Sequence, residues 1–135
     1  MARLLLDTNA LIWIVENNAR LGRAARAAAD RAAAAGDLHT SAYSFLEIAN
    51  LQSKGKVRFT VSPSRFRDDV LALGIREIAM TGEVALRSAD FLSLGGDPGD
   101  RVILACAAVE RCTLLTSDVR LLAWRGSLPR MDARR

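Results

Sequence analysis

Short apolar runs alternate with helix-forming segments along the whole chain, and this alternation constrains the fold more than any other feature. Alternating strands and helices are typical of α/β proteins with a mostly parallel sheet. We therefore expect a helix-rich, three-layer α/β/α sandwich. The expected strands are residues 3–6, 38–40, 75–79 and 113–116, with an edge strand near 130–133. The expected helices are residues 10–15, 21–35, 41–53, 63–73, 81–92 and 98–111.

Length and composition favour one ordinary globular domain over residues 1–135. The chain is 50% hydrophobic and 25% charged, and 19 basic against 15 acidic side chains give a net charge of +4, which suits an anionic partner such as nucleic acid. No apolar run approaches the roughly 20 residues that span a bilayer. No signal-peptide pattern follows Met1, so we expect a cytoplasmic protein. Cys106 and Cys112 have no zinc-ligand or redox spacing and are interpreted as reduced core residues.

Three acidic residues occupy positions where a parallel sheet gathers its ligands. Asp7 follows the first expected strand, Asp118 follows the strand at 113–116, and Asp100 lies at the start of a helix. In open parallel sheets, ligands bind outside the carboxyl ends of the strands, because loops and helix N-termini converge there. Asp7 and Asp118 are therefore expected at the same edge of the sheet.

Glu47 is an isolated charge in an otherwise uncharged segment. At the chain's charged fraction of 25%, the 16 residues from Leu38 to Ser53 would carry about four charged side chains, and Glu47 is the only Asp, Glu, Lys or Arg among them. We expect this helix to be largely buried, and a buried carboxylate needs a partner.

Each acid also has a structural interpretation. Asp7, Asp97 and Asp118 can cap the helices that they precede, and Asp100 can complete a capping box with Asp97. Glu47 can pair with an arginine. The joint pattern favours a common site, because capping alone does not explain three acids at loop edges together with one in an apolar helix.

Four converging carboxylates predict a divalent cation. Two like charges about 4 Å apart repel by about 4 kcal/mol at an effective dielectric near 20, which a marginally stable fold does not readily absorb. Mg²⁺ or Mn²⁺ accepts oxygen ligands and supports phosphodiester hydrolysis by an activated water. This chemistry needs no histidine, and His39 is interpreted as structural or solvated.

At this point the sequence resembles the PIN-domain nucleases, and within them the VapC-type toxins of bacterial toxin-antitoxin systems. The resemblance covers nearly the whole chain. It rests on four motifs in the family's order and spacing: Leu4-Leu5-Leu6-Asp7-Thr8-Asn9, Ser44-Phe45-Leu46-Glu47-Ile48, Asp97-Pro98-Gly99-Asp100-Arg101-Val102-Ile103-Leu104-Ala105 and Leu114-Leu115-Thr116-Ser117-Asp118.

The resemblance implies a metal-dependent endoribonuclease and assigns the site residues. The catalytic, metal-binding acids would be Asp7, Glu47, Asp100 and Asp118. Asn9, Asp97 and Thr116 would support them. The basic stretch that follows the glutamate helix would meet RNA phosphates through Lys54, Lys56 and Arg58, although a solvated turn explains it equally well.

The resemblance also implies a homodimer and an antitoxin that covers the acidic site. The chain departs from the commonest pattern at Gly99, often a bulkier residue. It also has Leu94-Gly95-Gly96 where a histidine frequently precedes the Asp-Pro pair. These departures leave the four acids in place and bear on loop shape and substrate choice.

Two rival functions are weighed against the nuclease. A haloacid-dehalogenase-type phosphotransferase also places an aspartate after its first strand, but it needs a second one two residues later, where this chain has Asn9. The other rival is a non-catalytic, basic α/β module that binds RNA or protein and uses the acids only as helix caps.

Overall fold

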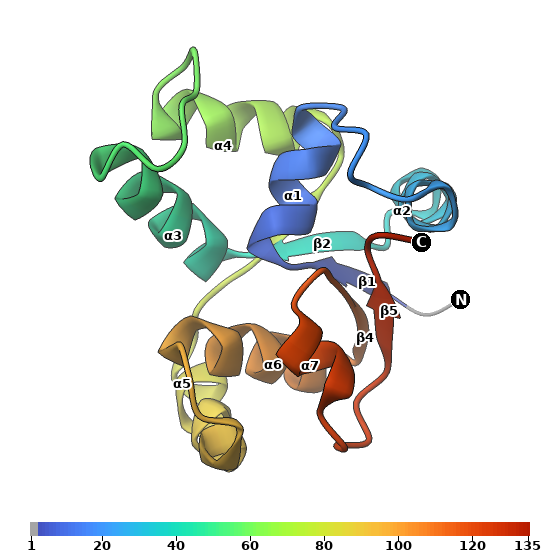
Figure 1. Ribbon diagram of the computed structural model, residues 1–135, viewed down its shortest axis with the longest axis vertical. Helices are drawn as coiled ribbons and strands as arrows, with labels where there is room; N and C mark the ends of the chain where they lie inside the picture. Colours follow the sequence, from blue (N-terminus) through green and yellow to red (C-terminus); the bar gives the residue numbers. More distant parts are fainter. Residues whose placement is uncertain (1–2) are drawn as a thin grey trace.

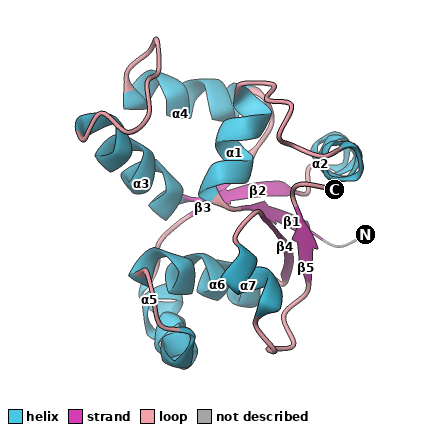
Figure 2. Ribbon diagram, viewed as in Figure 1, coloured by secondary structure: helices cyan, strands magenta, loops and turns pink. Residues whose placement is uncertain are grey.

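The computed structural model describes residues 3–135, and its centre is one sheet of parallel strands (Figures 1 and 2). In spatial order the described strands are β3 (Arg76–Ile78), β2 (Leu38–Ser41), β1 (Arg3–Leu6), β4 (Cys112–Thr116) and β5 (Arg130–Asp132). Leu6 is paired with Thr40 on one side and with Leu115 on the other. The chain adds strands first on one side of β1 and then on the other, so the topological switch point lies between β1 and β4.

Helices cover both faces of the sheet, which confirms the predicted three-layer sandwich (Figure 1). One layer contains α1 (Thr8–Val15), α2 (Arg23–Ala35), α3 (Ala42–Ser53) and α4 (Pro63–Ala72). The other contains α5 (Gly82–Ser88), the 3₁₀ helix η1 (Ala89–Leu94), α6 (Pro98–Glu110) and α7 (Val119–Ala123).

The central strand divides the apolar interior into two cores. Leu4 and Leu6 of β1 pack with α1, α2 and α3, whereas Leu5 packs on the opposite face with α6. Successive side chains of a strand point to opposite faces, so both faces of this parallel sheet are buried. The uninterrupted apolar run of β1 follows from this position.

Two residues limit the helices as the sequence indicates. Gly36 has φ 73° and ends α2, because glycine adopts the left-handed conformation without steric cost. The Ser41 side chain accepts a hydrogen bond from the Tyr43 backbone N–H and begins α3 directly after β2. The carboxyl end of β2 therefore leads straight into the helix that carries Glu47.

Two expectations from the sequence need correction. The Glu47 helix is not largely buried: in α3 only Ser44 and Ile48 are buried, and Leu46 is 52% exposed. Uncharged polar residues face solvent there, so a low charge count is a poor measure of burial. The helix expected over 81–92 is two pieces, α5 and the 3₁₀ helix η1, and within η1 Phe91 leaves helical geometry and lies edge-on to Trp124 with ring centroids 5.6 Å apart.

The cysteines and the lengths of the helices can also be compared with the sequence-based expectations. Cys106 and Cys112 are free and buried, which confirms their interpretation as core residues. Within residues 3–135, no helix is long and apolar enough to cross a membrane.

Candidate functional site

Asp7 lies where β1 ends and α1 begins. Its Oδ1 accepts from the Ala10 backbone N–H at 2.7 Å, and its Oδ2 accepts from Thr116 Oγ1 at 2.5 Å and from the Ser117 backbone N–H at 3.3 Å. The carboxylate is only 7% exposed. Burial raises its pKa above the ordinary value, and the nearby Asp118 raises it further, while the three hydrogen bonds oppose the shift.

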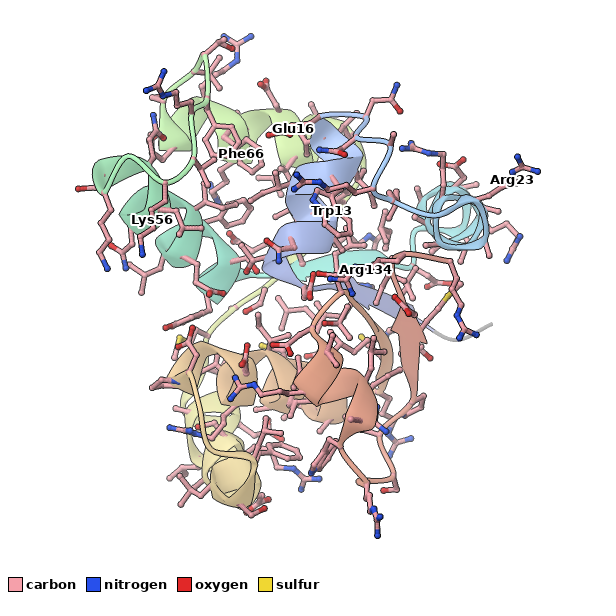
Figure 3. The ribbon with its side chains drawn as sticks, viewed as in Figure 1. Trp13, Glu16, Arg23, Lys56, Phe66 and Arg134 are labelled. Carbon is pink, nitrogen blue, oxygen red and sulfur yellow. The ribbon has the colours of Figure 1, made fainter. Side chains whose placement is uncertain are left out.

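Asp118 follows the neighbouring strand β4 and caps α7. Its side chain accepts from the Arg120 backbone N–H at 2.8 Å, and its own backbone N–H donates to Thr116 Oγ1 at 3.0 Å. Thr116 thus contacts both aspartate positions. The segment is also fixed by Arg134, which donates to the Ser117 carbonyl at 2.6 Å (Figure 3).

Glu47 lies in the middle of α3, and its side chain contacts Thr8, the residue that follows Asp7. Its Oε1 accepts from Thr8 Oγ1 at 2.7 Å, and Thr8 Oγ1 lies 3.0 Å from Ser44 Oγ. Burial raises the pKa of Glu47, and so does the negative charge of Asp97, Asp100 and Asp7. No arginine or lysine of the described chain forms a salt bridge with Glu47. The arginine-pairing interpretation of this residue is therefore wrong.

Asp100 lies in the first turn of α6, three residues after the helix cap Asp97. The Asp97 side chain accepts from the Gly99 backbone N–H at 3.0 Å, so its capping role is confirmed. Asp100 Oδ2 instead accepts from Arg120 Nη2 at 3.1 Å. Burial and the negative charges of neighbouring aspartates raise the pKa of Asp100 to about 6, although Arg120 opposes the shift.

The charge of neighbouring acids contributes to the raised pKa of Asp7, Glu47 and Asp100, so these three share one region at the carboxyl edge of the sheet with Asp97 and Asp118. Asp7 raises the pKa of Glu47 and of Asp100, Asp118 raises that of Asp7 and Asp100, and Asp97 raises that of Glu47 and Asp100. Capping and clustering thus occur together: Asp7, Asp97 and Asp118 cap helices whose N-termini point at the common site. The two interpretations of the sequence are not alternatives.

The donor set suits a hard divalent cation in chemical type. It consists of carboxylate oxygens whose mutual repulsion such a cation relieves. Among residues 3–135, however, no group of three or more histidine, cysteine, aspartate or glutamate side chains is already arranged to hold a metal ion. The Arg120 guanidinium supplies positive charge beside Asp100.

The remaining predicted residues differ in how close they lie to the acids. Lys54 and Lys56 line a cleft together with Glu47 and Asp97, and Figure 3 shows Lys56 near the C-terminal end of α3. Arg58 is exposed and does not line this cleft. Asn9 Nδ2 reaches Ser117 Oγ only at 3.5 Å, so its link to the site is long.

The structure adds residues that sequence reasoning missed. Thr8 and Ser44 hold Glu47 in place, Arg120 pairs with Asp100, and Tyr43 lies beside the acids. Thr8 and Ser44 carried a signal, since each stands within three residues of a predicted acid. Arg120 follows Asp118 by two residues, but the sequence gives no signal of its pairing with Asp100, because 20 residues and a strand separate the two.

The fold and the acidic edge define an α/β protein of the PIN type. The sequence model of the PIN domain family matches residues 4–125, and the chain belongs to this family. Ribonuclease VapC22 of Mycobacterium tuberculosis (strain ATCC 25618 / H37Rv) is 30% identical over 130 residues, which are 96% of this chain and 97% of that protein.

Solved structures support the fold. A chain of a toxin-antitoxin complex from Klebsiella pneumoniae is 23% identical with a TM-score of 0.62, over 96% of this chain and 97% of that one. A chain of DNA-bound VapBC from Salmonella typhimurium is 16% identical with a TM-score of 0.70, over 98% of both chains. VapBC2 from Rickettsia felis, bound to a promoter DNA fragment, is 14% identical with a TM-score of 0.68, over 95% and 96%.

Proposed function

We propose that this protein is a VapC-type endoribonuclease, the toxin of a toxin-antitoxin pair, which hydrolyses RNA phosphodiesters with Mg²⁺ or Mn²⁺. The observation that carries the proposal is the convergence of Asp7, Glu47, Asp100 and Asp118 from four separate elements. The negative charge of neighbouring acids contributes to the raised pKa of Asp7, Glu47 and Asp100. Membership of the PIN domain family and the similarity to ribonuclease VapC22 support it.

The four carboxylates would hold the ion, which when bound supplies positive charge to the scissile phosphate and lowers the pKa of water. The chain's own residues prepare this site. Three donors fix the Asp7 carboxylate, and the Thr8 hydroxyl fixes the Glu47 carboxylate. Two carboxylates on different elements therefore keep defined orientations. Asp100 is held by Arg120 until an ion competes for it.

Cleavage of a structured RNA by the purified protein tests the proposal. We expect cleavage with Mn²⁺ and none with EDTA, and we expect Asp7→Asn and Glu47→Gln to abolish cleavage while the fold survives. Asp30→Asn is the matched control, because Asp30 is exposed on α2 and outside the acidic group. Metal-independent RNA binding without any cleavage, unchanged in Asp7→Asn, would refute the nuclease and favour the binding module.

The proposal includes the partners and the cellular setting. A cognate antitoxin, a homodimer and a cytoplasmic site of action belong to the toxin role, and the similarity to chains of toxin-antitoxin complexes supports the first. A short open reading frame for a DNA-binding protein beside the gene, and copurification of its product, would support the antitoxin. Light scattering of the purified chain would measure the oligomeric state.

A further inference from the structure

A polar cleft leads away from the acids along one face of α3. It has a volume of about 240 Å³ and is lined by Tyr43, Glu47, Asn50, Leu51, Lys54, Lys56 and Asp97. The first four of these residues stand at helical spacing on α3 and form one stripe of that helix, which Lys54 continues at the C-cap. The cleft is smaller than the roughly 300–1,000 Å³ of sites for drug-sized ligands, and it suits one unit of a polymer.

Tyr43 forms an aromatic wall of this cleft. Its ring leans against the backbone of Gly99, because a Cβ at position 99 would lie only 2.6 Å from Tyr43 Cε1 and 3.4 Å from Glu47 Cδ. The absence of a side chain at this position therefore makes room for the ring. Tyr43 is also partly buried against the core beneath α6, which limits its freedom to turn away.

The charges at the two ends of the cleft have opposite signs. Glu47 and Asp97 lie at the end that joins the acidic group, and exposed Lys54 and Lys56 lie at the other. A nucleic acid strand carries both features that this arrangement matches: a base with an aromatic face and phosphates with negative charge. An acidic protein segment could pair with the two lysines, but it would leave the aromatic face of Tyr43 without a matching group.

We propose that this cleft is a nucleotide subsite, in which Tyr43 stacks on one base of single-stranded RNA while Lys54 and Lys56 hold the phosphate beyond it. The subsite rests on the proposed nuclease function, since it fixes the nucleotide next to the phosphate that the acids would receive. Tyr43 is a substrate-binding residue in this scheme, and Gly99 is a positioning residue that admits its ring.

Binding of a short fluorescent single-stranded RNA, followed by anisotropy in Asp7→Asn protein so that the probe stays intact, tests the subsite. We expect Tyr43→Leu to weaken binding about tenfold, as for the loss of one stacked base, and Tyr43→Phe to retain it. An otherwise identical abasic probe provides the decisive comparison. The penalty of Tyr43→Leu should vanish with it, because no base remains to stack.

The lysines give a different signature from the tyrosine. Lys54→Gln and Lys56→Gln should each weaken binding of both probes and reduce the slope of log K against log salt by about 0.7. Arg31→Gln on α2, which removes an exposed charge outside the cleft, is the matched control and should leave the slope unchanged.

A second measurement leaves Tyr43 in place, so it remains informative even if Tyr43→Leu fails to fold. The chain has one tyrosine, so ¹³C-labelled tyrosine gives NMR ring signals from Tyr43 alone. These signals should shift with the base-containing probe and stay in place with the abasic one. Equal binding of Tyr43→Leu and Tyr43→Phe, or unshifted signals at saturation, would overturn the subsite. The nuclease proposal is judged separately, by whether the unmodified protein cleaves RNA with Mn²⁺.

Discussion

Replacing Asp100 with asparagine is expected to stabilise the metal-free protein at neutral and alkaline pH, although it should destroy the nuclease activity proposed here. The Asp100 carboxyl is buried among other acids, with 18% of the side chain exposed, and the folded protein raises its pKa from 3.8 to about 6. Its ionised form is therefore less favourable in the folded state than in the unfolded chain. Asparagine removes the charge and keeps the shape.

The magnitude and sign follow from proton linkage. A pKa rise from 3.8 to about 6 corresponds to about 3 kcal/mol of lost stability once the carboxyl is ionised. Between about pH 4 and pH 6 the folded protein binds more protons than the unfolded chain. The free energy of unfolding of the unmodified protein therefore falls as pH rises through that window. The ion pair with Arg120 also disappears in the variant, and its 53% exposed guanidinium keeps that loss small. The net gain should be about 1–3 kcal/mol.

Urea unfolding in EDTA from about pH 4 to about pH 8 measures this difference. Asp30→Asn serves as the control, because it makes the same chemical change at an exposed site. Adding Mn²⁺ should reverse the order, since a bound ion stabilises the protein that retains the complete acid set. A variant no more stable than the unmodified protein at about pH 8, or a difference that does not grow with pH, would refute the electrostatic account of this site.

Three further predictions concern neighbouring residues. Thr116→Val removes a donor to buried Asp7 and should lower the free energy of unfolding by about 1–3 kcal/mol in urea melts; a loss below about 0.5 kcal/mol would show that the bond contributes little. Arg120→Gln removes the cation beside Asp100 and should tighten Mn²⁺ binding about two- to fivefold by calorimetry, whereas weaker binding would contradict its role as a competing charge. Cys112 has a pKa raised by burial to about 11, so its thiolate fraction at about pH 8 is on the order of one in a thousand. Thiol reagents should modify it rapidly only in urea, and rapid modification of the folded protein would show that it is accessible.

The elements of the fold were predictable because their signals are local. Short, largely apolar segments predicted the positions of β1 and β4, and Gly36 and Ser41 marked helix boundaries through the left-handed backbone of the one and the capping side chain of the other. The exposure of α3 was not predictable from its low charge, because serine and asparagine face solvent as readily as charged residues do. The non-helical geometry of Phe91 inside η1 accompanies its contact with Trp124, which is a tertiary feature.

The candidate site divides in the same way. Asp7, Asp100 and Asp118 could be located from their positions after strands or at a helix start, because parallel strands bring their carboxyl ends to one edge, and Glu47 could be located as the one charged residue of its segment. Arg120 and Tyr43 could not, since their importance arises from what faces them across the fold: Asp100 in one case and the bare backbone of Gly99 in the other. Neither residue type is unusual at its place in the sequence.

The order of the strands also bears on when the molecule becomes complete. β1 lies at the centre of the sheet, but its neighbour β4, which leads to Asp118, is made only after β2 and β3. A nascent chain on the ribosome therefore holds only part of the acid set until translation has passed that aspartate. If the protein attacks RNA, the machinery that makes it meets the complete acid set only after Asp118 has been added to each copy.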